Sequence, residues 1–320
     1  MALTAFDIFA QGVQMFLVPA FAPLLCGVIR KVKSRLQRRQ GASVFQPYRD
    51  LWKLLRKDVV PAENTSWIYR AAPYFILATT WVGLTLVPTF ATALMFHWAA
   101  DLIAIVGLMA TARFALALAG MDVGTSFGGL GASREMMFST IAEPAMLMVV
   151  FTVSMIAHTT QLSAIADFLM QEPMALRISL VLTLVTLVTV LIAENGRVPV
   201  DNPATHLELT MVHEAMILEY SGRHLALIEA AAMLKLVLYI ALFSCLFTPF
   251  GMMSEVRDIQ ALGVALGIFF LKLLFGGVLL AFGETSVAKM RVFRVNEFLG
   301  IGLMLGLLAA LLLFASEGMK

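Results

Sequence analysis

Several ionisable side chains fall within stretches of the sequence that are otherwise apolar. They are Arg113, Glu143, Glu194, Lys235, Lys272 and Glu284. A charge at the centre of a bilayer costs about 2.5–3.5 kcal/mol on insertion scales, so each such group needs a partner, a water-filled cavity or a function. Two interpretations stay open. The groups form structural ion pairs between helices, with end residues reaching the lipid headgroups, or the carboxylates relay protons through a helix bundle.

The segment that follows Glu194 is the most polar one within reach of these groups. It has two prolines within five residues, Pro199 and Pro203, which break a helix and leave backbone groups that need protein or water beside them. We predict a hydrated proton path through Glu143, Glu194, Asp201, Glu208, Glu214 and Glu219. The predicted charge partners are Arg113, Arg197, Lys235 and Lys272. The alternative interpretation of this segment is a solvated amphipathic loop.

The chain lacks the residue patterns of a metal or nucleotide site. It has no Cys-x-x-Cys pair, no histidine cluster at ligand spacing and no glycine-rich phosphate loop. Cys26 and Cys245 both lie in apolar stretches, where packing is favoured over a disulfide or metal ligation. We therefore predict no catalytic residue, no metal and no cofactor in this chain.

The composition identifies the solvent around the elements that hold these groups. Hydrophobic residues make up 60% of the chain and charged residues only 14%, whereas soluble domains are about half apolar and a quarter charged. Apolar runs of about twenty residues recur along the chain, and that length crosses a hydrocarbon layer of roughly 30 Å. The net charge of +2 is too small to indicate nucleic-acid binding. The sequence thus predicts an all-α, polytopic membrane protein.

Eight spans are expected, forming a single integral membrane domain over residues 1–320. They are Ile8–Ile29, Ala71–Leu94, Ala99–Ala119, Met136–His158, Leu176–Ala193, Leu225–Phe247, Ile259–Phe282 and Glu297–Ala315. Of the 23 lysines and arginines, 17 lie in the odd-numbered connections and three on the opposite side. Because positive loops stay in the cytoplasm, we predict cytoplasmic loops near 30–70, 120–135, 194–224 and 283–296, and both termini outside the inner membrane.

Three separated motifs resemble one family. Residues 39–55 read RQGASVFQPYRDLWKLL, and residues 194–201 read ENGRVPVD and are followed by EYSG at 219–222. Both resemble signatures of a membrane protein shared by respiratory complex I, where it is the first mitochondrial or the bacterial H component, and membrane-bound nickel–iron hydrogenases of the formate hydrogenlyase type. Residues 120–135, GMDVGTSFGGLGASRE, are similar to the hydrogenase branch. The match covers most of the chain in order.

The resemblance has departures that bear on function. Ala204 and His206 stand where complex I proteins usually carry acidic residues, and the stretch from Glu208 to Glu219 is about three residues longer than the family pattern and adds Glu214. Ala42 follows Gly41 where proline is more common, and the complex I form Gly-Pro-Asn-Arg-x-Gly is absent. The acidic route is thus rebuilt or partly lost, and a quinone-site interpretation is weakened.

The resemblance implies a membrane subunit of an energy-converting nickel–iron hydrogenase complex that is not catalytic alone. The nickel–iron centre and iron–sulfur clusters would belong to hydrogenase large, small and iron–sulfur subunits on the cytoplasmic face, beside antiporter-like membrane subunits. Such a subunit would contribute to proton or sodium translocation. The alternatives are the quinone-chamber subunit of a complex I and a self-contained transporter, although the inverted repeats typical of transporters are not found.

The basic first loop has two interpretations. It contains eleven lysines and arginines, interleaved with Tyr48, Trp52 and Trp67. Attraction to anionic lipid explains such a loop at about 1 kcal/mol per basic residue. We also predict that the loop docks the soluble module through Arg39, Gln46, Arg49, Asp50 and Lys53, assisted by Arg134 and Glu135 of the second cytoplasmic connection.

Overall fold

The computed structural model describes residues 5–171, 178–201, 211–254 and 259–318, which form helices and no β-strand. In chain order the elements are α1 (Ala5–Gly12), the π-helix η1 (Val13–Leu17), α2 (Val18–Ala20), α3 (Ala22–Leu36), α4 (Gln46–Leu55), α5 (Trp67–Leu86), the 3₁₀-helix η2 (His97–Ala99), α6 (Leu102–Asp122), α7 (Ser126–Ala157), α8 (Leu162–Gln171), α9 (Ile178–Glu194), α10 (His213–Ile217), α11 (Gly222–Phe247), α12 (Ile259–Ser286) and α13 (Val292–Gly318). The predicted all-α class is confirmed.

The first membrane segment is longer than the sequence predicts. α1, η1, α2 and α3 follow one another almost without interruption, and Phe6–Leu36 forms one apolar helical stretch of 31 residues, against the predicted Ile8–Ile29. A helix of that length extends for roughly 46 Å, which exceeds a hydrocarbon layer of roughly 30 Å. Its last turns carry several basic residues, so α3 continues past the hydrocarbon layer and reaches α4 at the surface.

Each of the eight predicted spans contains a helix, although the helices differ in length and polarity. Within the described residues, six segments are long and apolar enough to cross a membrane: Phe6–Leu36, Leu102–Asp122, Ser126–Ala157, Gly222–Phe247, Ile259–Ser286 and Arg294–Ser316. The other two predicted spans correspond to α9, which has 17 residues, and α5, which buries three threonines against its neighbours. The polytopic architecture is confirmed.

Two connections contain more helix than the sequence predicts. α7 begins at Ser126, ten residues before the predicted start, and the Thr125 side chain caps it by accepting a hydrogen bond from the Gly128 N–H at 3.2 Å. The connection near 120–135 is therefore mostly helical. α8 lies between α7 and α9, and it buries Leu162, Ile165 and Leu169 on one face. Its ten residues are too few for a span, so the search for long apolar windows missed it.

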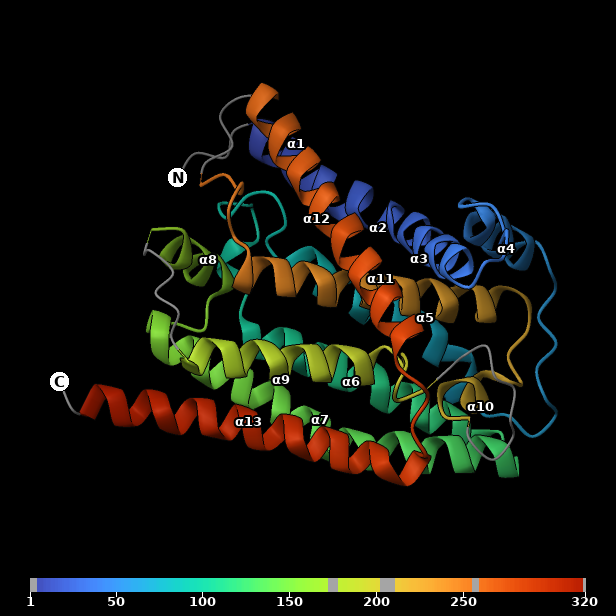
Figure 1. Cartoon of the computed structure of the whole chain (residues 1–320). Helices are drawn as coiled ribbons and strands as arrows, with labels where there is room; N and C mark the ends of the chain where they lie inside the picture. The colour runs from blue at the N-terminus through green and yellow to red at the C-terminus, as the bar shows by residue number, and fades with distance from the viewer. Residues whose placement is uncertain (1–4, 172–177, 202–210, 255–258, 319–320) are drawn as a thin grey trace.

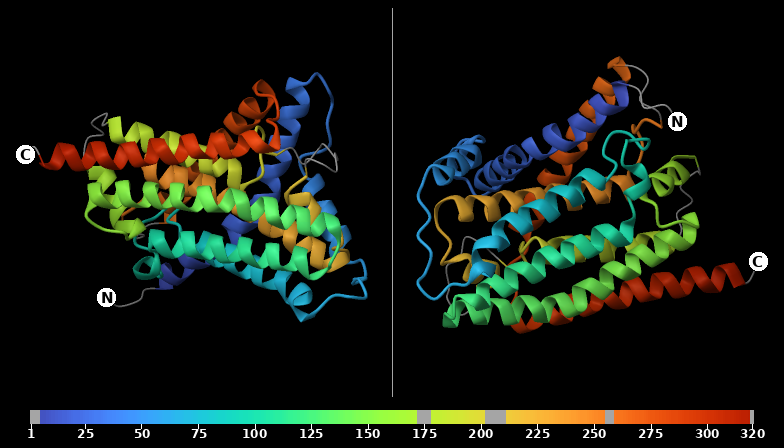
Figure 2. Two further views of the ribbon diagram at one scale, coloured as in Figure 1. Left: turned by 90° about the horizontal axis from the view of Figure 1, so that it is seen from below. Right: turned by 180° about the vertical axis from the view of Figure 1, so that it is seen from behind.

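The helices form one bundle in which α11 is the most enclosed. In the most apolar window of α11, 72% of residues are buried, against 28% in α12 and 33% in α13. Figure 1 shows α12 and α13 along the outside of the bundle, and both chain ends lie at the same end of it in Figures 1 and 2. An even number of crossings has this consequence. α11 is therefore the element against which the other helices position their side chains.

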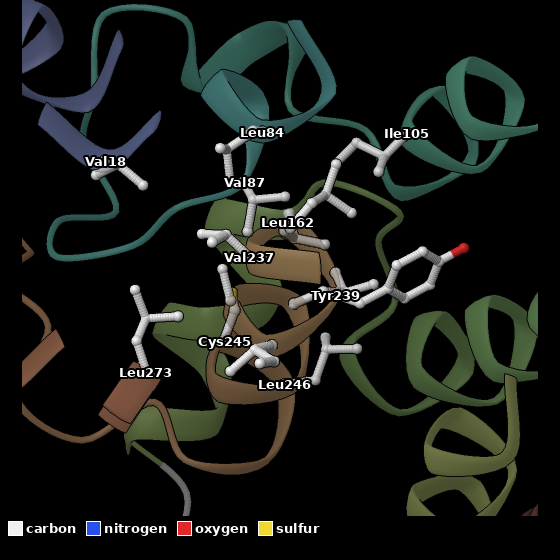
Figure 3. Close-up of a cluster of buried hydrophobic side chains, with 14 of the residues drawn as sticks. Val18, Leu84, Val87, Ile105, Leu162, Val237, Tyr239, Cys245, Leu246 and Leu273 are labelled. Carbon is white, nitrogen blue, oxygen red and sulfur yellow. The ribbon is translucent and has the colours of Figure 1, made fainter. Parts of the chain in front are cut away.

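The main apolar core surrounds α11. Figure 3 shows side chains of α2, α5, α6, α8, α11 and α12 in this cluster, with Val18, Leu84, Val87, Ile105, Leu162, Val237, Tyr239, Cys245, Leu246 and Leu273 labelled. All of these are buried. Each large apolar side chain fully buried contributes about 1.5–3 kcal/mol in water, whereas within lipid the gain comes from close packing. The core holds the helices in register for the charged groups described next.

Candidate functional site

Arg113 of α6 lies at the centre of a buried group of charges. It is 6% exposed, and its guanidinium contacts carboxylates on two neighbouring helices. One Nη atom forms an ion pair with Glu194 of α9, and the other lies 3.3 Å from Glu143 Oε1 of α7. The Nε atom is 3.7 Å from Glu135 Oε1, also on α7. The arginine therefore joins α6, α7 and α9.

Lys235 of α11 completes this group from the enclosed side of the bundle. Its Nζ lies 2.8 Å from Glu194 Oε2, so the two oxygens of Glu194 meet different cations. We name Arg113, Glu135, Glu143, Glu194 and Lys235 the Arg113 cluster. It contains three carboxylates and two cations, and it therefore has one carboxylate in excess. Of the four predicted charge partners, Arg113 and Lys235 lie in this cluster.

Exposure is graded across the Arg113 cluster. The side chain of Glu194 is 3% exposed, that of Glu135 is 18% exposed and that of Glu143 is 39% exposed. A cavity of about 10 Å³ lies between Arg113, Glu135 and Glu194, close to the smallest volume that holds one water. Pro144 follows Glu143 inside α7 and lacks the N–H that would bond to the Thr140 carbonyl. A proton has a short route here between a buried and a partly exposed carboxylate.

A second buried group of charges surrounds Glu284 of α12. The side chain of Glu284 is 1% exposed, with Lys33 Nζ of α3 at 2.6 Å from Oε2 and Arg197 Nη1 at 3.3 Å from Oε1. We name these three residues the Glu284 cluster. Its one carboxylate meets two cations, the reverse of the balance in the Arg113 cluster. The predicted charge partner Arg197 thus lies here, apart from Arg113.

The chain between the two clusters is the turn that ends α9. The Arg197 N–H donates to the Ile192 carbonyl at 3.0 Å, and Gly196 has φ +54°, the left-handed conformation common after a helix C-terminus. The turn places Glu194 in the first cluster and Arg197 in the second. Asp201, four residues later, is buried and lies 2.8 Å from Lys289 Nζ. The sequence predicted that this segment breaks the helix, and the break is what joins the clusters.

The remaining predicted path residues lie outside both clusters. Glu208 falls outside the described residues. Glu214 is half-buried on α10, and Glu219 is exposed, with its backbone carbonyl accepting a 2.7 Å hydrogen bond from the Tyr69 hydroxyl. Lys272, predicted as a charge partner, donates instead to the carbonyls of Thr248 and Phe250 at 2.5 Å each, beyond the C-terminal end of α11.

The EYSG segment at 219–222 fastens the end of the first loop. Tyr220 stacks on Tyr69 with ring centroids 4.0 Å apart, and its hydroxyl donates to the Tyr69 carbonyl at 3.0 Å. Burial raises the pKa of Tyr220 above its usual range, which keeps the hydroxyl protonated. Gly222 has φ +53°, and a Cβ there would lie 2.3 Å from the Asp58 carbonyl oxygen. Only glycine fits this position, so the motif holds the first loop against α11.

The predicted docking residues divide between a surface helix and the cluster. α4 carries Gln46, whose amide donates to Asp50 Oδ1 at 2.9 Å, and Tyr48, whose hydroxyl donates to the Ala20 carbonyl at 2.5 Å. Arg39, Arg49 and Lys53 are exposed. Arg134 donates to the Met211 carbonyl at 2.9 Å, and Glu135 faces Arg113. The surface available for docking is therefore the first loop and α4.

The described residues contain no group of three or more histidine, cysteine, aspartate or glutamate side chains arranged to hold a metal ion. Cys26 and Cys245 are both buried with free thiols. The charges of both clusters meet one another, and the arrangement is suited to holding and moving protons.

Three residues that meet buried charges were not predicted to do so. Glu135, predicted for docking, lies eight residues before Glu143, and this spacing places both on the same face of one helix once α7 extends through them. That periodicity was a usable signal. Lys33 and Lys289 lie in basic connections that resemble any cytoplasmic surface, and nothing in the sequence marks either lysine as the partner of a buried carboxylate.

Comparison with known proteins places this geometry among membrane subunits of oxidoreductases. The profile of the NADH dehydrogenase family matches residues 10–315. The chain is 32% identical over 280 residues to formate hydrogenlyase subunit 4 of Escherichia coli K12, covering 88% of this chain and 90% of that protein. It is 31% identical over 303 residues to hydrogenase-4 component C of the same organism, with 94% and 93% covered.

More distant relatives share the fold. The H component of the NADH-quinone oxidoreductase of Anaplasma phagocytophilum is 26% identical over 237 residues, covering 68% of this chain and 69% of that protein. A chain of the membrane-bound sulfane sulfur reductase, an archaeal respiratory membrane complex, superposes with a TM-score of 0.84 at 17% identity, covering 96% of this chain and 99% of that chain. At that identity the likeness concerns the fold alone.

Proposed function

The chain belongs to the NADH dehydrogenase family, and from this premise we propose that it is a membrane subunit of an energy-converting nickel–iron hydrogenase complex. In this role it anchors a soluble hydrogenase module and takes part in coupled proton or sodium translocation. The names of the two relatives above 30% identity, formate hydrogenlyase subunit 4 and hydrogenase-4 component C, support the hydrogenase branch. The catalytic metals belong to the partner subunits.

The observation that carries the transport role is the charge balance of the Arg113 cluster. Three carboxylates face two cations, so one bound proton makes the cluster neutral and a released proton leaves one net negative charge. Titrating groups that share partners bind protons as a set. Glu194 is the buried member and Glu143 the partly exposed one, and Arg113 contacts both. The cluster can therefore alternate between two charge states without losing its ion pairs.

Anchoring is proposed for the opposite surface of the same end of the bundle. The first loop and α4 present Arg39, Arg49 and Lys53, and Gly27 lets the loop approach α3 so closely that a Cβ there would lie 1.9 Å from the Val44 carbonyl oxygen. The 17 to 3 partition of basic residues supports a cytoplasmic location for this surface and an outward location for both termini. The proposed partners are the hydrogenase large, small and iron–sulfur subunits, beside antiporter-like membrane subunits.

Replacing Glu194 by Gln tests the transport role. Glutamine keeps the shape and removes the titrating group, and it leaves two carboxylates with two cations, so the complex is expected to assemble. Hydrogen turnover with benzyl viologen should persist, because it reports only the soluble module. Proton uptake by sealed vesicles containing the complex should fall about tenfold or more, as for loss of a positioned proton-transfer group.

Glu63→Gln is the matched control, because Glu63 is exposed in the first loop and contacts neither cluster. It should leave both measurements unchanged. The double variant with Gln at 143 and 194 gives the sharper result. If this variant assembles and its vesicles take up protons at the normal rate, the proton-transfer role of the cluster is wrong.

A further inference from the structure

A polar cavity of about 360 Å³ lies apart from both clusters, between α3, α4 and α11. Its lining residues are Arg30, Asp50, Lys53, Leu54, Lys57, Glu229 and Met233. Cavities of about 300–1,000 Å³ hold small molecules or headgroups of that size. The question is which chemistry suits three cations, two carboxylates and two apolar side chains.

The three cations are not neutralised by the protein itself. In the described part of the chain, no carboxylate lies within ion-pair distance of Arg30, Lys53 or Lys57. Asp50 accepts a hydrogen bond from Gln46 at 2.9 Å and is not paired with a cation. Three cations that converge on a cavity without a partner match a phosphate, which accepts several charge-assisted hydrogen bonds. The two carboxylates are acceptors only, so the ligand must also carry donors.

The cavity lies at the level where the hydrocarbon layer meets the headgroups. Ile29 is fully buried in the apolar core and Arg30 beside it is exposed, so the chain changes environment at this point. Glu229 lies seven residues into α11, about 10 Å from its start at about 1.5 Å per residue. Leu54 and Met233 supply apolar contacts next to the charges. A lipid can enter such a site with its chains still in the bilayer.

We propose that this cavity binds the headgroup of a phospholipid that carries hydrogen-bond donors, such as phosphatidylglycerol or phosphatidylethanolamine. Arg30, Lys53 and Lys57 hold the phosphate, and Asp50 and Glu229 accept hydrogen bonds from the hydroxyl or ammonium groups of the head. Phosphatidylcholine has a phosphate but no such donor, so it satisfies only half of the site. The site depends on neither module docking nor ion transport, and it stands or falls separately from the proposed function.

Binding of short-chain lipids to the full chain in detergent tests this site. Dihexanoyl phosphatidylglycerol, phosphatidylethanolamine and phosphatidylcholine, together with inorganic phosphate, would be titrated while bound species are counted by native mass spectrometry. The first two lipids should bind about tenfold more tightly than phosphatidylcholine, since one charge-assisted hydrogen bond contributes about 1.5–3 kcal/mol. Inorganic phosphate should bind more weakly than any of the lipids, because it lacks the apolar contacts.

Variants separate the two halves of the site. Lys53→Gln, on the exposed face of α4, should weaken binding of all three lipids about tenfold through loss of one charge-assisted contact. Asp50→Asn with Glu229→Gln should instead remove the preference over phosphatidylcholine. Arg35→Gln is the matched control, because Arg35 is an exposed cation of α3 that does not line the cavity.

Two results would overturn the proposal. If the three lipids bind equally and Lys53→Gln changes nothing, the cavity is not a headgroup site. If inorganic phosphate binds as tightly as the lipids and loses affinity in the same variants, the site belongs to a free anion and the lipid assignment is wrong.

Discussion

The Arg113 cluster and the Glu284 cluster are both buried ion-pair groups, yet their charge balance is opposite. In the first, three carboxylates meet two cations, and in the second a single carboxylate meets Lys33 and Arg197. Adding a proton neutralises the first group and leaves the second with two unpaired cations. The comparison indicates that burial alone does not mark a proton-exchanging site. The surplus of one sign of charge decides which carboxylate can change its state and which must stay ionised.

Arg113→Gln should have the largest effect on stability. It leaves three carboxylates with only Lys235, at a cost of about 5 kcal/mol, the upper part of the range for breaking a buried pair. Chemical unfolding of the purified chain in mixed micelles would measure the free energy of unfolding. Arg49→Gln, an exposed arginine of α4, is the control and should unfold like the wild type. Equal free energies for both variants would show that Arg113 is not the organising charge.

Glu284→Gln should come second, with a loss of about 3–5 kcal/mol, because it strands Lys33 and Arg197 in the interior. The expected loss is well above that of Glu194→Gln, whose cluster becomes charge-balanced. Thermal unfolding of the two variants side by side measures the difference, with Glu297→Gln on the exposed face of α13 as the control. A greater loss for Glu194→Gln than for Glu284→Gln would contradict the charge-balance argument.

Glu135→Gln should have the smallest effect. Glu135 is 3.7 Å from Arg113 and is 18% exposed, so its ion pair contributes about 0–1 kcal/mol in partial contact with solvent. The same unfolding measurement applies, and the wild-type chain at high salt serves as the comparison because salt weakens exposed pairs first. A loss above that range would place Glu135 among the essential members of the cluster and narrow the contrast with Glu284.

The helical segments were predictable because their signal is local. An apolar run of about twenty residues is a property of consecutive residues, so the predicted spans each contain a helix. The same local rule missed α8, which is too short for a span, and shortened α7, whose first turns are polar. Helices that bury polar or brief segments are stabilised by their neighbours, and neighbours are not visible in a window of sequence.

The site was predictable in its members and less so in its pairings. Buried ionisable residues stand out against an apolar sequence, so Arg113, Glu143, Glu194 and Lys235 were identified and do meet. Lys272 was grouped with them by type and lies instead beyond the end of α11. Depth along a span can be counted from the sequence, whereas the direction in which a side chain points depends on how each helix is rotated against the others.

By itself the sequence determined that the chain is an apolar helical membrane protein, that carboxylates and cations lie at membrane depth, and that the helix breaks after Glu194. Tertiary structure alone decided that Lys33 meets Glu284, some 250 residues away, and that Arg113 serves three carboxylates at once. The physical reason is that lipid forces charges to be buried and paired but does not say with what. Packing of the helices around α11 chooses each partner, and with it the charge balance on which function depends.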